Sequence, residues 1–374
     1  MAYKIWMNKQ NTHVPEMDYL RAFAILAVLA IHVSAGFTAI PNINALMVVN
    51  IGIDIFSHFA VPLFIFISGF VLYLKYQKNY SQKEFYQKRF WRIIPPYLLF
   101  TTFYLIFNAF IAAYKTGTFT FPSILQIAYA YLAAGGYYHL WFFLIIIELY
   151  LLYPVIIKIY NFFLDRGTDW LFLVLALVLQ LGWQIFGANF QLHLFGYDLS
   201  ITNKIFFCEI FYLVFGIYIC KHYPTIKEWV LKKSILTFVT PTIIFTIIGS
   251  GLWLTGIYIY GSYNSIPDIS FTFIESLIQP LFYLFIFALL FAVSNKITNS
   301  NKNFKWLLTV SLYSFGIYLI HPFFQTGLIY VGKIFGITYE TIIYYPLTFI
   351  LTLALSMIFV YIIRKFKYYK YIIG

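Results

Sequence analysis

The chain has 374 residues, of which 62% are hydrophobic and 10% are charged, and its formal net charge is +12. This composition excludes an ordinary soluble domain, in which about a quarter of the residues are charged. The basic residues lie in short segments between apolar runs, which follows membrane topology and argues against nucleic-acid binding. We therefore predict an all-α, polytopic helix bundle that forms a single domain over residues 1–374.

Apolar segments long enough to cross a lipid bilayer recur along the whole chain. About ten spans are expected, over residues 19–40, 51–74, 93–113, 139–157, 170–187, 205–220, 235–257, 271–293, 307–331 and 342–363. Residues 124–134, inside the weakly defined stretch 114–138, indicate an interfacial or re-entrant helix. The first span contains VSA at 33–35, which resembles a signal-peptide cleavage site, but its apolar run is long for the apolar region of a signal peptide. We interpret it as an uncleaved span.

The distribution of Lys and Arg predicts the orientation of these spans. With the N-terminus in the cytoplasm, 22 of the 25 basic residues fall on the cytoplasmic side, and Lys115, Lys204 and Lys333 fall outside. An excess of this kind is the positive-inside pattern of multi-pass membrane proteins. We therefore expect both termini to be cytoplasmic.

The first span carries two ionisable residues, Arg21 and His32. They are eleven residues apart, almost three helical turns, so they share one face and are separated by roughly 16 Å along the axis. An ionisable side chain inside a membrane is costly and is a functional hypothesis by default. The spacing leaves a second interpretation open, in which Arg21 anchors the helix at the headgroups and His32 is a hydrogen-bonded core residue.

Further histidines lie in the same outer half of the membrane as His32. Asp54 and His58 are four residues apart on one face of the second span, His139 begins the fourth, and His321 lies past the middle of the ninth. No HxxxH or HxH pair is present and the histidines come from four spans, so no metal is expected. His321 precedes Pro322, which also fits a hydrogen bond at a helix kink.

Two arginines, Arg89 and Arg92, lie in KRFWRIIPPY (88–97) where the third span begins. They are either anchors at the headgroups or part of a phosphate site, to which Arg21 is expected to contribute from the same depth. Glu148, near the middle of the fourth span, is either a satisfied core carboxylate or, like Asp54, a group that orients a histidine.

This arrangement predicts a path across the membrane. A cationic inner mouth suits a donor that carries phosphates, and histidine suits general-base work on a hydroxyl that arrives from outside. Acyl-CoA fits the description of such a donor, because it joins several phosphates to a long arm that ends in a thioester.

Five stretches carry a resemblance to a known family. They are LRAFAILAVLAIH (20–32), GIDIFSHFAVPLFIFISGFVL (52–72), KRFWRIIPPY (88–97), YHLWFFLIIIELYLLYP (138–154) and SLYSFGIYLIHPFF (311–324). In their order and in the Arg-x10-His of the first span, the chain resembles the acyltransferase-3 family of integral membrane acyltransferases. The resemblance implies that Arg21 and His32 are central, that Arg89 and Arg92 serve the donor, and that His139, Trp141, Ser311 and His321 support the site.

Within that family the chain is most similar to the intercellular-adhesin polysaccharide subgroup, through FGIYI (215–219) and the basic ending RKFKYYKYIIG (364–374). The resemblance implies an O-acyltransferase of the bacterial plasma membrane that moves an acetyl or succinyl group from acetyl-CoA or succinyl-CoA to hydroxyls of an extracytoplasmic polysaccharide or cell-wall glycan. A polysaccharide synthase complex is a further expected partner.

Two other functions stay open at this point. A polysaccharide exporter or flippase would also need a bundle with a polar interior, although the inverted repeats typical of transporters are not evident in the sequence. A purely structural partner of a synthase is disfavoured by the ionisable residues within the spans. The acyl group, the acceptor, the oligomeric state, and the choice between an acyl-enzyme and direct transfer are left open by the sequence.

Overall fold

The computed structural model describes residues 13–36, 43–77, 80–187, 191–194, 197–200, 204–260, 269–300 and 304–374. Among these residues, nine helical segments are long and apolar enough to cross a bilayer. The polytopic, all-α class is therefore confirmed. One small antiparallel hairpin is added, in which β1 (Gln191–Leu194) pairs with β2 (Tyr197–Ser200) in the register Gln191↔Ser200.

The helices follow the predicted spans closely in most places. Their bounds are α2 (Pro15–Ser34), α3 (Ala45–Ser57), α4 (Ala60–Lys75), α5 (Gln82–Thr116), α6 (Ile124–Leu132), α7 (Trp141–Leu164), α8 (Asp169–Phe186), the 3-10 turn η2 (Phe206–Cys208), α9 (Ile210–Lys221), α10 (Tyr223–Lys232), α11 (Leu236–Tyr260), α12 (Ile269–Asn299), α13 (Lys305–Ile334), α14 (Tyr344–Ile363) and α15 (Lys370–Ile373). The short helix expected at 124–134 is α6.

Two predicted spans differ from the expectation. The second is two helices, α3 and α4, which are separated by a turn at His58 and Phe59. Pro62 lies in the first turn of α4, where a missing N–H is tolerated, so a new helix starts there more easily than the old one continues. The sixth is α9, which at 12 residues is shorter than the roughly 20 that a perpendicular crossing needs.

Local sequence explains where the third membrane helix begins and ends. The Ser81 hydroxyl accepts a hydrogen bond from the backbone N–H of Glu84 and caps the start of α5. Gly117 ends the helix with a φ of 76°, a left-handed conformation that glycine adopts without steric cost. α5 thus begins eleven residues before the expected 93, and Arg89 and Arg92 lie within its first three turns instead of at its start.

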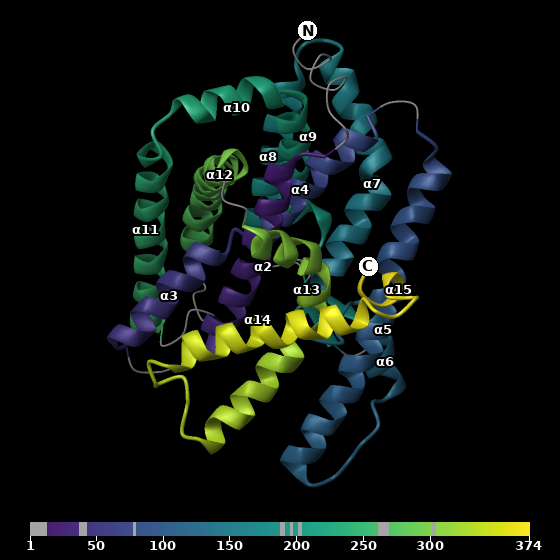
Figure 1. Ribbon diagram of the computed structural model, residues 1–374, viewed down its shortest axis with the longest axis vertical. Helices are drawn as coiled ribbons and strands as arrows, with labels where there is room; N and C mark the ends of the chain where they lie inside the picture. Colours follow the sequence, from purple (N-terminus) through teal and green to yellow (C-terminus); the bar gives the residue numbers. More distant parts are fainter. Residues whose placement is uncertain are drawn as a thin grey trace. The chain divides into compact units, whose positions relative to one another are not determined.

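The described residues form two compact units that alternate along the chain. The first unit draws on Met1–Val71 and Ile219–Ile362, and the second on Leu72–Tyr218 and Ile363–Gly374. Figure 1 shows the helices of each unit in the colours of the sequence. Each unit is described below by itself.

In the first unit, α2 lies against α13, α3 and α12, and α11 lies against α12 and α3 (Figure 1). The α2 face that these helices cover is built from small and branched residues, among them Ala24, Ile25, Val28 and Leu29. Such a face lets the neighbouring backbones approach closely. α2 is consequently the central helix of this unit.

In the second unit, α5 lies against α7, α6 and the short C-terminal helix α15, and α7 lies against α8. Aromatic side chains fill much of this unit, and Tyr73, Tyr104, Tyr153 and Phe85 are among its most deeply buried. Phe85 and Tyr153 stack with their ring centroids 5.4 Å apart, which fixes the start of α5 to α7.

Candidate functional site

Two histidines from distant parts of the sequence meet in the first unit. His32, near the end of α2, stacks on His321 of α13 with ring centroids 5.1 Å apart and an angle of 23° between the ring planes. His321 is completely buried, whereas His32 is partly exposed. His32 is therefore the more accessible member of this histidine pair, and the buried His321 packs against it.

Pro322 explains how the ring of His321 is oriented. In a regular helix the N–H of residue 322 would donate to the carbonyl of Tyr318, but proline has no N–H. The Nδ1–H of His321 donates to this carbonyl at 2.9 Å and to that of Ile317 at 3.1 Å. Nδ1 then carries the proton of the neutral ring and Nε2 carries the lone pair. The hydrogen bond expected beside Pro322 is therefore present.

The backbone of His32 is held by the same neighbouring helix. The side-chain amide of Gln325, one turn beyond His321 on α13, donates a hydrogen bond to the carbonyl oxygen of His32. Ser311 and Ser314 are buried on α13 as well. α13 therefore positions both the ring and the main chain of His32.

Asp54 connects α3 to the end of α2 that carries His32. The hydroxyl of Ser34 donates to Asp54 Oδ1 at 2.7 Å, and both side chains are buried. The Nδ1–H of His58 donates to the Asp54 carbonyl at 2.8 Å, and Nδ1 lies 3.5 Å from Asp54 Oδ2. Asp54 and His58 share one face, as their spacing predicted, and Ser34 is a partner of Asp54 that sequence spacing did not reveal.

Arg21 lies toward the other end of α2. Its guanidinium forms an ion pair with Asp18 at 3.0 Å, and Asp18 also contacts Nε2 of His13 at 2.6 Å. About a third of the Arg21 side chain is exposed. Because Arg21 belongs to the first unit while Arg89 and Arg92 belong to the second, a phosphate site shared by the three arginines stays a prediction.

Arg89 is held by aromatic rings in the second unit. Its guanidinium carbon lies 5.5 Å from the ring centroid of Tyr76, 5.6 Å from that of Phe85 and 5.2 Å from that of Tyr150. Such cation–π contacts fix a planar cation without neutralising its charge. Arg92 is exposed, one turn further along α5.

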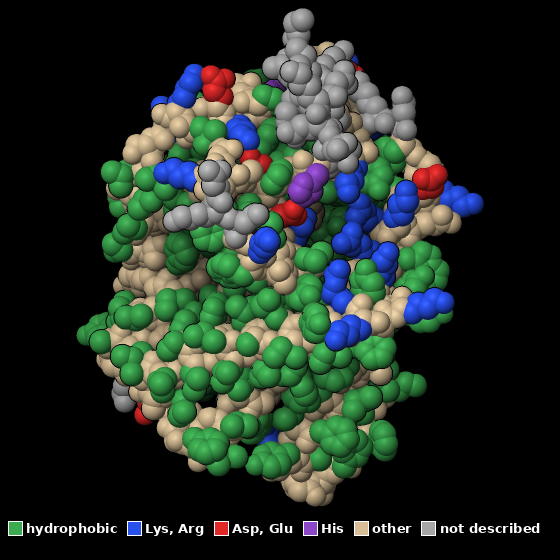
Figure 2. All heavy atoms as spheres, in the orientation of Figure 1, with side chains coloured by type: hydrophobic (Ala, Val, Ile, Leu, Met, Phe, Trp, Pro, Cys, Tyr) green, Lys and Arg blue, Asp and Glu red, His purple; other side chains and the backbone are tan. Residues whose placement is uncertain are grey.

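The C-terminal residues add more positive charge beside these arginines. α15 lies against α5, and Tyr371 meets Trp91 edge-on with ring centroids 5.9 Å apart. Lys365, Lys367 and Lys370 belong to the same C-terminal segment, and Figure 2 shows Lys and Arg side chains gathered in this region of the surface. We call residues 363–374 the C-terminal hook. The alternation of basic and aromatic residues in this segment was a sequence signal for a surface contact, but the packing of the hook against α5 was not predicted.

His139 and Glu148 both lie in the second unit. The buried His139 ring meets Tyr104 edge-on, with ring centroids 5.1 Å apart. Glu148 accepts the backbone N–H of Phe206 at 2.7 Å and so ties α7 to η2. The grouping of His139 with the other histidines, and a role for Glu148 in orienting one, stay predictions.

Metal ligands do not cluster in the part of the chain that the structure describes: no three or more His, Cys, Asp or Glu side chains there are arranged to hold an ion. The arrangement that is present is a stacked histidine pair near an aspartate that contacts Ser34 and His58, and imidazole is the side chain most often used as a general base toward a hydroxyl group. Together, the fold and this site define a multi-pass membrane protein with a pair of contacting histidines inside its first unit.

Comparison with known proteins identifies the family. The model of the acyltransferase domain matches residues 14–361, and the chain belongs to the acyltransferase-3 family. A protein of Staphylococcus aureus (strain MRSA252) named as a probable poly-beta-1,6-N-acetyl-D-glucosamine export protein is 25% identical, over 96% of this chain and 95% of its own length. A protein of the same name from Staphylococcus epidermidis is 26% identical, over 96% and 94%. No solved structure matches.

Proposed function

We propose that the protein transfers an acyl group from acyl-CoA to a hydroxyl of an extracytoplasmic polysaccharide. The observation that carries the proposal is the histidine pair, in which a reachable His32 is backed by the buried, oriented His321. Membership of the acyltransferase-3 family supports the reaction class. The names of the two relatives refer to a polymer of N-acetylglucosamine, which supports a polysaccharide as the acceptor.

The chemistry proposed for His32 is general-base catalysis. Its imidazole takes the proton of the acceptor hydroxyl as that oxygen attacks the carbonyl carbon of the thioester. The carbon–sulfur bond then breaks, the new ester remains on the acceptor, and the CoA thiolate takes the proton back from the imidazolium. In the other possible route the acyl group rests on the imidazole between two transfers, which an acyl-enzyme trapped without acceptor would reveal.

The donor is proposed to enter beside the cationic face of the second unit. Arg89 and Arg92 on α5, with the lysines of the C-terminal hook, provide several positive charges in one region. Phosphate groups bind well to such clusters because their hydrogen bonds are assisted by charge. Acetyl-CoA and succinyl-CoA both carry the required phosphates, so the proposal covers either donor.

The proposal puts this cationic face on the cytoplasmic side, which is the orientation that the distribution of Lys and Arg predicts, and labelling tests it. In a variant with Cys208 and Cys220 replaced by alanine, single cysteines at Gln87 and Ser300 should be protected from an impermeant thiol reagent added to intact cells. A cysteine at Ser265 should react with it. The reverse pattern would invert the donor and acceptor sides.

The function itself is tested with purified protein in nanodiscs. Radiolabelled acetyl-CoA or succinyl-CoA and an oligomer of β-1,6-linked N-acetylglucosamine should yield an alkali-labile ester on the oligomer. The relatives' names favour a second candidate, export of the polymer without acyl transfer. In that case proteoliposomes would move the oligomer across the membrane while no ester forms with either donor.

A further inference from the structure

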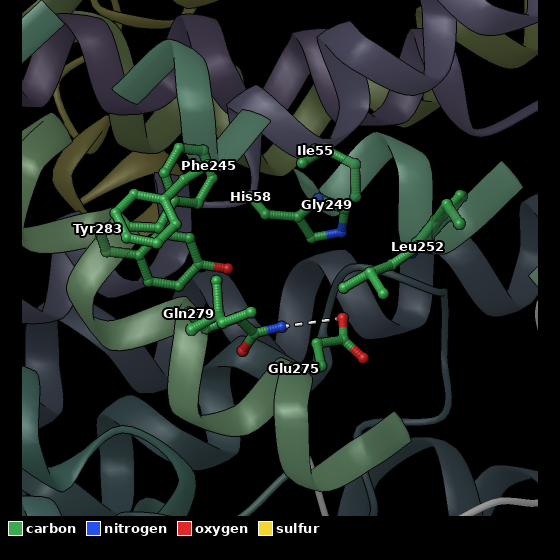
Figure 3. A pocket seen from close by; sticks show the side chains of 11 residues that line it. Ile55, His58, Phe245, Gly249, Leu252, Glu275, Gln279 and Tyr283 are labelled. Atoms are coloured by element: carbon green, nitrogen blue, oxygen red, sulfur yellow. Dashed lines mark hydrogen bonds between the residues drawn. The ribbon is translucent and has the colours of Figure 1, made fainter. Parts of the chain in front are cut away.

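A pocket opens in the first unit between α3, α11 and α12. It holds about 490 Å³ of empty space, part of which is open to the surroundings. Figure 3 shows His58 of the turn that follows α3, Gly249 of α11, and Glu275, Gln279 and Tyr283 of α12 around this space. At Gly249 a Cβ atom would lie 2.8 Å from Ile55 Cγ2, so glycine allows α11 and α3 to come together at this wall.

The pocket combines a carboxylate and an amide with aromatic rings. The Gln279 Nε2 amide donates a hydrogen bond to Glu275 Oε1 at 3.1 Å, one turn apart on α12, as Figure 3 shows. Trp253 and Tyr283 add aromatic surface to the wall. Sugar hydroxyls both donate and accept, which a carboxylate beside an amide can match, while the C–H face of a sugar ring packs on aromatic rings.

The pocket is connected to the histidine pair by a chain of contacts. His58, one of its lining residues, is hydrogen-bonded to the backbone of Asp54, and Asp54 accepts the hydroxyl of Ser34. Ser34 lies two residues beyond His32 on α2. A ligand in the pocket therefore lies against α3, and α3 is hydrogen-bonded to the end of α2 that carries His32.

We propose that this pocket binds a neutral or amine-bearing sugar unit of the acceptor, next to the unit that is acylated, and this rests on the function proposed above. Trp253 and Glu275 lie within about two turns of the ends of α11 and α12 that face the extracytoplasmic side in our orientation. The Glu275 carboxylate accepts hydroxyl or ammonium groups and repels the carboxylate of an acidic sugar. The pocket thus selects the class of acceptor.

Calorimetric titration of the purified full-length protein tests whether the pocket binds such a sugar unit. The ligands are a β-1,6-linked N-acetylglucosamine tetramer, its de-N-acetylated form and a uronic-acid tetramer. Glu275→Gln and Trp253→Ala should each weaken binding of the first two ligands about tenfold or more, the loss expected for one strong contact. The uronic-acid tetramer should bind wild type weakly. In Glu275→Gln, the difference in affinity between this tetramer and the other two ligands should become smaller. Glu228→Gln and Trp306→Ala, both on exposed residues, are the matched controls.

A role in acceptor binding also predicts how steady-state kinetics change. The KM for the oligosaccharide should rise in Glu275→Gln, while kcat and the KM for acyl-CoA stay near wild type. Three results would each overturn the proposal. Both pocket variants could bind the tetramers as tightly as wild type, wild type could fail to bind either preferred tetramer, or the variants could lose affinity for acyl-CoA instead of the tetramers. Wild-type protein that binds the tetramer through Glu275 but forms no ester would support the pocket and refute the acyltransferase.

Discussion

The two units handle ionisable side chains in different ways. In the first, interior polar groups contact one another: His32 stacks on His321, Ser34 binds Asp54, and Glu16 binds Lys227. In the second, Glu148 is held by the N–H of Phe206 and Arg89 by three aromatic rings, beside one buried side-chain pair in which Tyr160 donates to Asp169. Polar side chains that contact one another hold each other in place, whereas a cation framed by rings keeps its charge for a ligand.

This difference suggests a division of labour that experiments can break or sharpen. If chemistry belongs to the first unit, substitutions there should lower kcat with little effect on donor affinity. If the second unit recognises the donor, substitutions on its cationic face should weaken donor affinity with little effect on kcat.

The largest effect is expected from His32→Gln. A general base contributes about 10²- to 10⁴-fold, so acylation of the oligosaccharide should fall to about 1% of wild type or less. Expression and thermal stability in detergent should stay near wild type, since glutamine keeps a polar group at a partly exposed position. His222→Gln, at the junction of α9 and α10, is the control. Normal ester formation by His32→Gln would return His32 to a packing role.

The histidine pair also shows how far the sequence alone leads. Hydropathy located the spans, and Pro322 beside His321 indicated the hydrogen bond that orients this ring. The stacking of His32 on His321 could not be predicted, because it depends on how α2 lies against a helix almost 300 residues away in the chain. Long-range contacts of this kind are set by complementary surfaces and leave no periodic signal in either helix.

Smaller features were missed although local signals existed. Pro62 within the apolar run 51–74 was the signal for the break between α3 and α4. Period-two alternation around Gly196 was the signal for the hairpin of β1 and β2. The pocket around Glu275 had no such signal. Its lining residues come from three helices, and the position of Glu275 in its helix does not distinguish it from an ordinary helical residue.

The next effect concerns stability in the first unit. Glu16 is buried, contacts Nζ of Lys227 at 2.5 Å and accepts the Asn295 amide at 2.8 Å. Glu16→Gln should lower the free energy of unfolding by about 3 kcal/mol, because it leaves a partly buried ammonium without its counter-charge. Thermal melting in detergent measures the loss. Glu228→Gln, which breaks the exposed pair with Lys232, should leave the melting temperature almost unchanged. Equal melting temperatures for the two variants would show that the contacts of Glu16 with Lys227 and Asn295 do not stabilise the fold.

A smaller effect is expected on donor affinity in the second unit. Arg89→Ala and Arg92→Ala should each weaken CoA binding by about 1.5–3 kcal/mol, the range for a hydrogen bond to a charged group. The difference from wild type should shrink as salt is added, because screening weakens the wild-type contact too. Arg89→Lys separates charge from shape, since lysine lacks the planar group that the three rings frame.

Calorimetric titration with CoA measures these changes. Arg166→Ala is the matched control, because Arg166 is an exposed arginine that lies over the ring of Phe162 after α7. Both α5 variants should keep the wild-type affinity for the oligosaccharide. If they bind CoA as tightly as wild type, the two arginines are anchors at the headgroups, and the donor site must be sought elsewhere.

The smallest effect tests whether the C-terminal hook belongs to the cationic face. Tyr371→Ala removes the edge-on contact with Trp91, and an aromatic pair contributes about 0.5–1.5 kcal/mol. Residues 363–374 should then exchange amide hydrogens faster, and CoA affinity should fall a few-fold as the hook lysines leave α5. Tyr361→Ala, on the exposed side of α14, should change neither quantity. Faster exchange with unchanged CoA affinity would show that the hook only covers α5, and that Arg89 and Arg92 act without it.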